Sequence, residues 1–192
     1  MTIPSVTKAA MLNGLTFTDA SLHTGFPGLT GASEVSGGAY ARKSITVNAA
    51  SGGTRALNAG VTFDVPACTV RWVGFWNSTT FVGCVPNGGA TPLNFMALPS
   101  NDQVYSAGHG YTDGQKIVFY NGSPPAPLVE GTVYFVRDAA TDYFKVAATL
   151  GGTALDLSAA STFGCVVSAI TETVYGGADT HALTAANFVI PD

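Results

Sequence analysis

Charged side chains are scarce in this 192-residue chain. Lys and Arg number 8 and Asp and Glu number 12, so 10% of the residues are charged, where a typical soluble domain has about 25%. Disorder does not explain the scarcity, because 46% of the residues are apolar and a chain of this length can bury about two-thirds of its unfolded surface. Either Thr, Ser, Asn and Gly make up the solvent face, or neighbouring copies cover part of it. We favour coverage by neighbouring copies.

Basic clusters and long apolar runs are also missing. The net charge is -4 and the sequence pI is about 5.1, which argues against a nucleic-acid partner, because binding to phosphates requires clustered cations. The N-terminal segment has no basic stretch followed by an apolar run, which predicts no secretory signal and synthesis in the cytoplasm. The long uncharged stretch between Arg71 and Asp102 is interrupted by Gly, Asn and Pro, so it predicts strands and turns and no membrane insertion.

The cysteines form an odd set of three, Cys68, Cys84 and Cys165, without Cys-x-x-Cys spacing or paired histidines. The pattern therefore predicts no zinc site, and nothing in the chain predicts a cofactor. Cys68 and Cys84 could face each other on neighbouring strands. Cytoplasmic synthesis favours the alternative that the cysteines are small buried apolar residues.

Glycine and proline, by contrast, are abundant, with 23 Gly and 10 Pro. Gly-Gly pairs supply the positive φ angles of tight turns and separate short runs that alternate apolar with polar or small residues. This pattern predicts an all-β fold, a β-sandwich of jelly-roll type, with strands within 44–48, 59–65, 69–76, 116–120, 132–136 and 143–147.

One short helix is predicted near the N-terminus. Ser5 is placed as its N-cap, Gly14 as its terminator, and Val6, Ala9 and Ala10 are spaced to form an apolar face. This face could close one end of the sandwich or dock on a neighbouring subunit, and the sequence leaves both open.

Two changes in composition, near residues 98–101 and 169–171, indicate two β units. We predict a sandwich domain for anchoring and assembly, formed by residues 1–100 plus 171–192. Residues 101–170 would form an inserted small β-barrel-like module.

Histidine, the most common general base, is present three times and never at metal-binding spacing. His23 could act as a base, but we favour an imidazole that hydrogen-bonds the backbone of its own loop. His109 and His181 lie in predicted turns, and a pairing of His181 with Asp179 has no further support. The chain also has no Gly-x-Ser-x-Gly elbow and no phosphate-binding loop.

Paired carboxylates would indicate a glycosidase, but the acidic residues of the middle segment lie in predicted turns: Asp102, Asp113, Asp138 and Asp142. Trp72 and Trp76 lie four residues apart on a predicted strand and share one face, so an exposed pair could stack on sugar rings. Burial in the core is the favoured alternative. We expect no enzymatic activity and no catalytic, cofactor or metal site.

Two neighbouring motifs carry a resemblance to a known family. They are Leu22-His23-Thr24-Gly25-Phe26-Pro27-Gly28 and Gly37-Gly38-Ala39-Tyr40-Ala41-Arg42, followed by a Gly-Gly-Thr turn and the aromatic strand Val73-Gly74-Phe75-Trp76. With these motifs the chain resembles a family of tailed-bacteriophage virion proteins, and residues 101–170 resemble a small module of phage structural proteins. Candidate assembly or loop residues are His23, Thr24, Gly25, Pro27, Gly28, Tyr40, Arg42, Trp72 and Trp76.

The resemblance implies a structural protein of the virion, of minor tail, tail-tip or tail-fibre type. A capsid decoration or head-fibre protein is the first alternative, and an adsorption protein that binds a host surface glycan is the second. Expected partners are copies of the same chain, in a trimer or larger ring, and other virion proteins.

Overall fold

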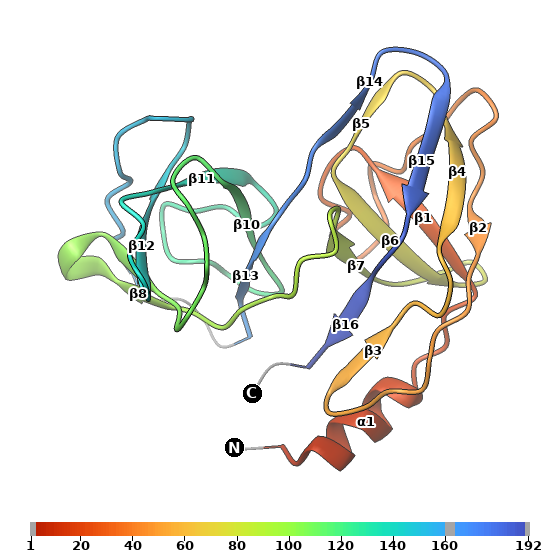
Figure 1. The fold of residues 1–192 in the computed structure, drawn as a ribbon, viewed down its shortest axis with the longest axis horizontal. Helices are drawn as coiled ribbons and strands as arrows, with labels where there is room; N and C mark the ends of the chain where they lie inside the picture. Colours follow the sequence, from red (N-terminus) through yellow and green to blue (C-terminus); the bar gives the residue numbers. More distant parts are fainter. Residues whose placement is uncertain (1–2, 160–163, 191–192) are drawn as a thin grey trace. The chain divides into compact units, whose positions relative to one another are not determined.

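The computed structural model describes residues 3–159 and 164–190, which form two compact units. Unit 1 comprises Met1–Ala90 and Thr171–Asp192, and unit 2 comprises Thr91–Ile170. The two units are coloured along the chain in Figure 1. Unit 1 contains α1 (Ser5–Asn13), β1 (Asp19–His23), β2 (Lys43–Ser44), β3 (Thr54–Ala56), β4 (Val61–Val65), β5 (Cys68–Val70), β6 (Trp72–Asn77), β7 (Thr80–Pro86), β14 (Thr173–Tyr175), β15 (Asp179–Leu183) and β16 (Asn187–Val189). Unit 2 contains β8 (Met96–Leu98), a 3-10 turn (Pro99–Asn101), β9 (Gln103–Tyr105), β10 (Lys116–Tyr120), β11 (Val133–Arg137), β12 (Tyr143–Ala147) and β13 (Val166–Ala169).

Unit 1 is a β-sandwich. Its four-stranded antiparallel sheet has the order β2-β1-β6-β7. The last three strands of the chain return to pair with early ones, β14 with β5, β15 with β4 and β16 with β3 (Figure 1). Leu22, Val73 and Phe75 from the sheet share one hydrophobic core with Phe63 and Leu183 from the facing strands.

Unit 2 is a curled six-stranded antiparallel sheet with the order β13-β10-β11-β12-β9-β8. The sheet closes on itself just before β8, where Leu93 and Val167 exchange backbone hydrogen bonds of 2.8 and 3.0 Å. Ile117, Phe119 and Phe144 are fully buried inside. Closure leaves no edge between the two ends of the sheet, so the unit is barrel-like.

The predicted all-β class is confirmed, together with the short helix near the N-terminus. β10 and β12 have the predicted bounds. The run 69–76 is divided at Arg71 into β5 and β6, which pair with different partners. Of the run 44–48, only Ser44 belongs to a strand, β2.

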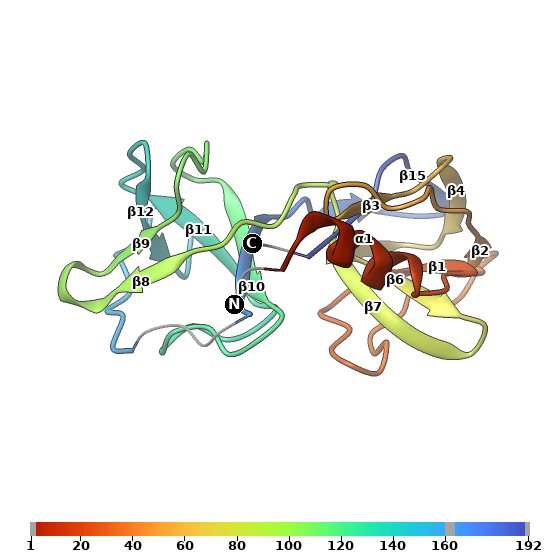
Figure 2. The ribbon, with the colours of Figure 1, turned by 90° about the horizontal axis from the view of Figure 1, so that it is seen from below.

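The predicted N-cap of the helix is wrong, because Pro4 takes this position, without a side-chain bond. Gly14 ends the helix as predicted, with an ordinary φ of -72°. The side of the helix that is buried is not the predicted apolar face. α1 lies beside β3 (Figure 2) and buries Lys8 and Leu12, whereas Val6 is 74% exposed. Lys8 packs its aliphatic stem against the turn at Gly53. The spacing of apolar residues does not predict this contact, because Lys counts as a charged residue.

Unit 2 begins at Thr91, ten residues before the start that the sequence suggests. β8 is only three residues long, too short to show a periodicity, and pairs with β9. The return to unit 1 lies between Ile170 and Thr171.

None of the three cysteines forms a disulfide, and Cys165 is buried. Cys68 and Cys84 do not face each other on neighbouring strands, because β5 pairs with β14 and β7 pairs with β6.

Candidate functional site

The segment between β1 and β2 folds over one face of the four-stranded sheet, and most of the predicted candidate residues gather there. Val73 and Phe75 of β6 point into the core. The alternate residues Trp72, Gly74 and Trp76 therefore point to the opposite face. Residues 24–34, which we call the β1 loop, cover this face.

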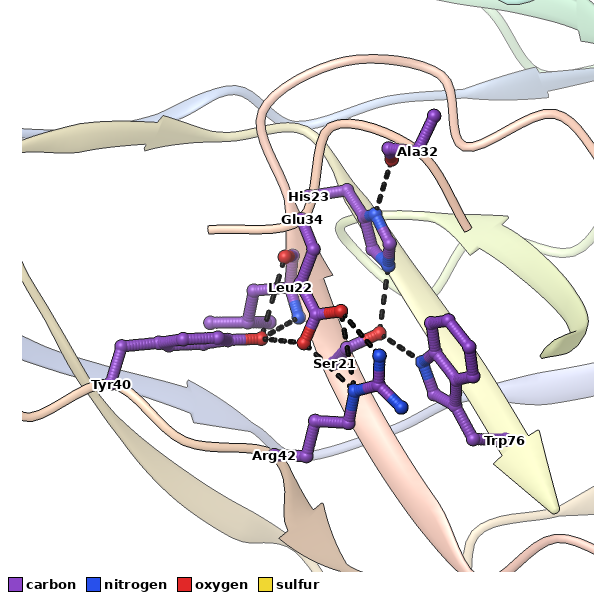
Figure 3. Close-up of polar contacts among 8 residues, drawn as sticks. All are labelled: Ser21, Leu22, His23, Ala32, Glu34, Tyr40, Arg42 and Trp76. Carbon is purple, nitrogen blue, oxygen red and sulfur yellow. Dashed lines mark hydrogen bonds and ion pairs between the residues drawn. The ribbon is translucent and has the colours of Figure 1, made fainter. Parts of the chain in front are cut away.

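A buried chain of hydrogen bonds ties the β1 loop to the sheet (Figure 3). Trp76 Nε1 donates to Ser21 Oγ at 2.7 Å, Ser21 Oγ lies 2.7 Å from His23 Nε2, and His23 Nδ1 lies 2.7 Å from the carbonyl oxygen of Ala32. Because a carbonyl oxygen can only accept, Nδ1 carries the imidazole proton and Nε2 accepts from the Ser21 hydroxyl. Ser21 and His23 have no exposed surface. The Trp76 Nε1, Ser21 Oγ and both His23 ring nitrogens therefore each have a hydrogen-bond partner, and this requires the His23 tautomer with the proton on Nδ1.

Burial lowers the pKa of His23 from its ordinary value of 6.5. The hydrogen bond to Ala32 and the Glu34 carboxylate act in the opposite direction, and the Arg42 guanidinium acts with burial. The imidazole is therefore neutral at neutral pH.

A second set of polar side chains, Glu34, Arg42 and Tyr40, lies beside this chain of hydrogen bonds. Glu34 accepts two hydrogen bonds from Arg42 Nε and one of 2.7 Å from Arg42 Nη2, and the guanidinium carbon lies 3.3 Å from the centre of the Trp76 ring. The Tyr40 hydroxyl accepts from the backbone N–H of Leu22 at 2.8 Å (Figure 3). That N–H belongs to the part of β1 beyond its pairing with β2, so Tyr40 takes the place of a neighbouring strand.

Close packing completes the attachment of the β1 loop. Gly31 has a φ of 76°, and a Cβ atom there would lie 2.5 Å from the Trp76 ring. Phe26 packs on Trp72 with ring centres 4.9 Å apart, and Arg71 Nη1 donates to the Thr24 carbonyl at 2.7 Å. Only glycine at position 31, which has no Cβ atom, allows the backbone to approach the indole this closely.

The tip of the β1 loop is solvent-exposed. Leu29 is 96% exposed, although it lies between the buried Pro27 and the closely packed Gly31. The N–H groups of Gly31 and Ala32 both donate to the Pro27 carbonyl, which fixes the turn. The structure therefore presents one apolar side chain on a fixed support.

Of the nine candidate residues, His23, Thr24, Gly25, Pro27 and Gly28 belong to this loop or its start, and Tyr40, Arg42, Trp72 and Trp76 contact it or its anchors. Ser21, Glu34, Gly74 and Leu29 also belong to this site and are not among the predicted candidates. Ser21 and His23 alternate on one strand, which was the available signal for their shared face. Contacts between segments far apart in sequence carry no such signal.

The other candidates have structural partners. Trp72 and Trp76 are 0% and 6% exposed, so they form no exposed sugar-stacking pair. Asp102, Asp113 and Asp142 each accept a backbone N–H of another loop, and Asp138 pairs with its neighbour Arg137. His109 accepts the N–H of Tyr111.

His181 lies in β15 opposite Phe63, which corrects the predicted turn. Its Nδ1 lies 2.9 Å from the Tyr175 hydroxyl, so Tyr175 and not Asp179 is its hydrogen-bond partner.

A site for covalent catalysis would need an accessible nucleophile, and the hydrogen-bonded Ser21–His23 pair is closed to solvent. Within residues 3–159 and 164–190, no three His, Cys, Asp or Glu side chains are grouped as metal ligands. In the same ranges, no helix has the length and apolar character that crossing a membrane requires.

Comparison with known proteins gives one family match. The sequence model of a family described as podophage GP4 fiber I protein gp80 matches residues 7–109, more than half of the chain. The match includes α1 from Thr7 onward, the β1 loop and the whole four-stranded sheet of unit 1. Searches of curated proteins and of solved structures give no match.

Proposed function

This chain belongs to the podophage GP4 fiber I protein gp80 family, and on that premise we propose that it is a non-enzymatic component of a phage fibre or tail that assembles as a symmetric homo-oligomer through unit 1. The family is one of phage fibre proteins, which are structural parts of the virion. The specific role, the oligomer and its contacts are our proposal. The observation that carries it is the exposed Leu29 on the firmly attached β1 loop.

A rigid apolar tip suits an assembly contact for an energetic reason. Ordering a mobile loop on binding costs free energy, and a loop that is already fixed avoids most of this cost. The hydrogen bonds of His23 and Thr24 to Ala32 and Ser33 fix both sides of the tip before any partner arrives. Burying one Leu side chain contributes about 2 kcal/mol per contact, and symmetry repeats the contact in each subunit.

The exposed side of α1 supplies a second contact surface on the same unit. Val6 and Met11 are 74% and 52% exposed, and Leu15 just after the helix is 42% exposed. Lys8, the one charged residue of α1, is turned inward. Two different apolar surfaces on one unit favour a head-to-tail interface, which closes into a ring such as a trimer.

The test is the oligomeric state of the purified chain, measured by light scattering after size exclusion. We expect a closed oligomer for the wild type, and dissociation in Leu29→Asn and in the double variant Val6→Asn, Met11→Gln. Leu150→Asn is the matched control, because Leu150 is also exposed, at 69%, but lies in unit 2. A monomeric wild type, or equal dissociation in the control, would contradict assembly through unit 1.

Placement in the particle needs a separate measurement. Quantitative mass spectrometry of purified virions should give the low copy number of a tail or fibre component. A copy number in the hundreds would instead indicate a capsid decoration protein.

A further inference from the structure

We propose that His23 is a pH switch: its protonation releases the β1 loop from β6 and thereby removes the Leu29 contact. The inference concerns the regulation of the proposed assembly site, so its consequence for assembly rests on the proposed function. The release of the loop itself is a property of the single chain.

The hydrogen-bond geometry accepts only neutral His23. Nδ1 donates to the Ala32 carbonyl, so Nε2 of the neutral ring carries no proton and accepts from the Ser21 hydroxyl, whose oxygen also receives the Trp76 N–H. A proton on Nε2 would present a second donor to the Ser21 oxygen and leave the hydroxyl hydrogen without its acceptor. Burying such an unpaired group costs about 1–3 kcal/mol, in addition to burying the charge.

The surrounding charges do not remove this conflict. Two ionised groups influence His23 from the segments above it, Glu34 from the β1 loop and Arg42 from the segment before β2. Glu34 attracts an imidazolium and Arg42 repels it, and the two are already paired with each other at 2.7 Å. Burial is the larger influence and lowers the pKa of His23, so the protonated ring is more stable in water. Water reaches the ring only when the loop moves.

Release of the β1 loop can be local because His23 and the hydrophobic core lie on opposite faces of the sheet. Leu22, Val73 and Phe75 pack into the core, whereas Ser21, His23 and Trp76 face the loop. The strand pairing between β1 and β6 uses backbone groups that protonation leaves unchanged. The β1 loop should therefore open while the sandwich remains folded.

The experiment is hydrogen exchange of the peptide spanning residues 24–35, followed by mass spectrometry from pH 7.5 to pH 4.5 and corrected for the intrinsic pH dependence of exchange. A loop whose opening takes up one proton should lose protection tenfold per pH unit below about 6.5, until the pKa of the closed state is reached. Peptides from β10 and β11 in unit 2 should keep their protection. Uniform protection of residues 24–35 across this range would overturn the proposal.

Variants assign the effect to His23. In His23→Gln the dependence on pH should disappear. The matched control is His181→Gln, because burial also lowers the pKa of His181, yet it lies in β15 beside Tyr175. A response that disappears in His181→Gln would overturn the assignment. Should His23→Gln not fold, the NMR titration of the His23 ring in the wild type replaces it, and a midpoint at or above the ordinary value of 6.5 counts against the proposal.

Failure of this inference differs from failure of the proposed assembly. Leu29→Asn removes the assembly contact and keeps the hydrogen bonds of His23. If acid releases the β1 loop in Leu29→Asn and the wild type is monomeric, the pH switch is supported and assembly through Leu29 is rejected. An acid-independent loop in a stable oligomer would do the reverse.

Discussion

The two units use different means to cover the faces of their sheets. In unit 2 the sheet is closed by the backbone hydrogen bonds between Leu93 and Val167, and an apolar core fills its interior. Unit 1 leaves one face of its sheet uncovered by strands, and the β1 loop covers it through paired polar side chains. Apolar packing tolerates many shapes, whereas a hydrogen-bond chain depends on each atom in it. The loop face of unit 1 should therefore be the part of the molecule most sensitive to small chemical changes.

Spectroscopy can distinguish the two units. Both tryptophans, Trp72 and Trp76, lie in unit 1, so tryptophan fluorescence reports its unfolding. Five of the seven tyrosines lie in unit 2, and near-ultraviolet circular dichroism of tyrosine reports mainly that unit.

Gly74→Ala should give the largest loss of stability. A Cβ atom at this position would collide with His23 Nε2 and Ser21 Oγ, both fully buried. Overpacking at such a site costs about 3 kcal/mol, measured by urea unfolding followed through tryptophan fluorescence. Gly83→Ala is the matched control, because Gly83 lies opposite Phe75 of β6 in the neighbouring strand and a Cβ there meets no atom within 4 Å. Equal losses in the two variants would show that strand propensity, and not the buried chain, explains the effect.

Ser21→Ala should have the next largest effect. It leaves Trp76 Nε1 and His23 Nε2 buried without their partner, at a cost of about 2 kcal/mol of unfolding free energy in unit 1. Ser106→Ala makes the same change in unit 2, where Ser106 is 2% exposed and its hydroxyl donates to the Asn94 carbonyl at 2.8 Å. We expect about 1 kcal/mol there, from urea unfolding followed by tyrosine circular dichroism. A larger loss for Ser106→Ala would contradict the contrast between the units.

Local patterns predicted those parts of the fold that depend on neighbouring residues. Alternation of apolar residues indicated β10 and β12 at their observed bounds, and the setting of His23 indicated an imidazole bonded to its own loop. A barrel-like form was expected for the inserted module, but the contact that closes unit 2 could not be predicted, because Leu93 and Val167 are far apart in the sequence and neither has a distinctive residue type.

The helix and the loop face show the same limit. The buried side of α1 depends on the aliphatic stem of Lys8, which the sequence represents only as a charge. The need for glycine at position 74 depends on the side chains of another strand, β1. In both cases the deciding contact is tertiary, and no short window of sequence contains both partners.

The smallest predicted effects come from removing one hydroxyl in each unit, by Tyr40→Phe and Tyr111→Phe. Burial raises the pKa of both phenols, so both are neutral at ordinary pH. The Tyr40 hydroxyl accepts the Leu22 N–H, and its loss should cost unit 1 about 1 kcal/mol. The Tyr111 hydroxyl is buried without a hydrogen-bond partner among residues 3–159 and 164–190, so its removal should leave the stability of unit 2 unchanged or slightly higher. Urea unfolding with the two optical signals measures both, and a destabilised Tyr111→Phe would mean that unit 2 also depends on a polar contact in its interior.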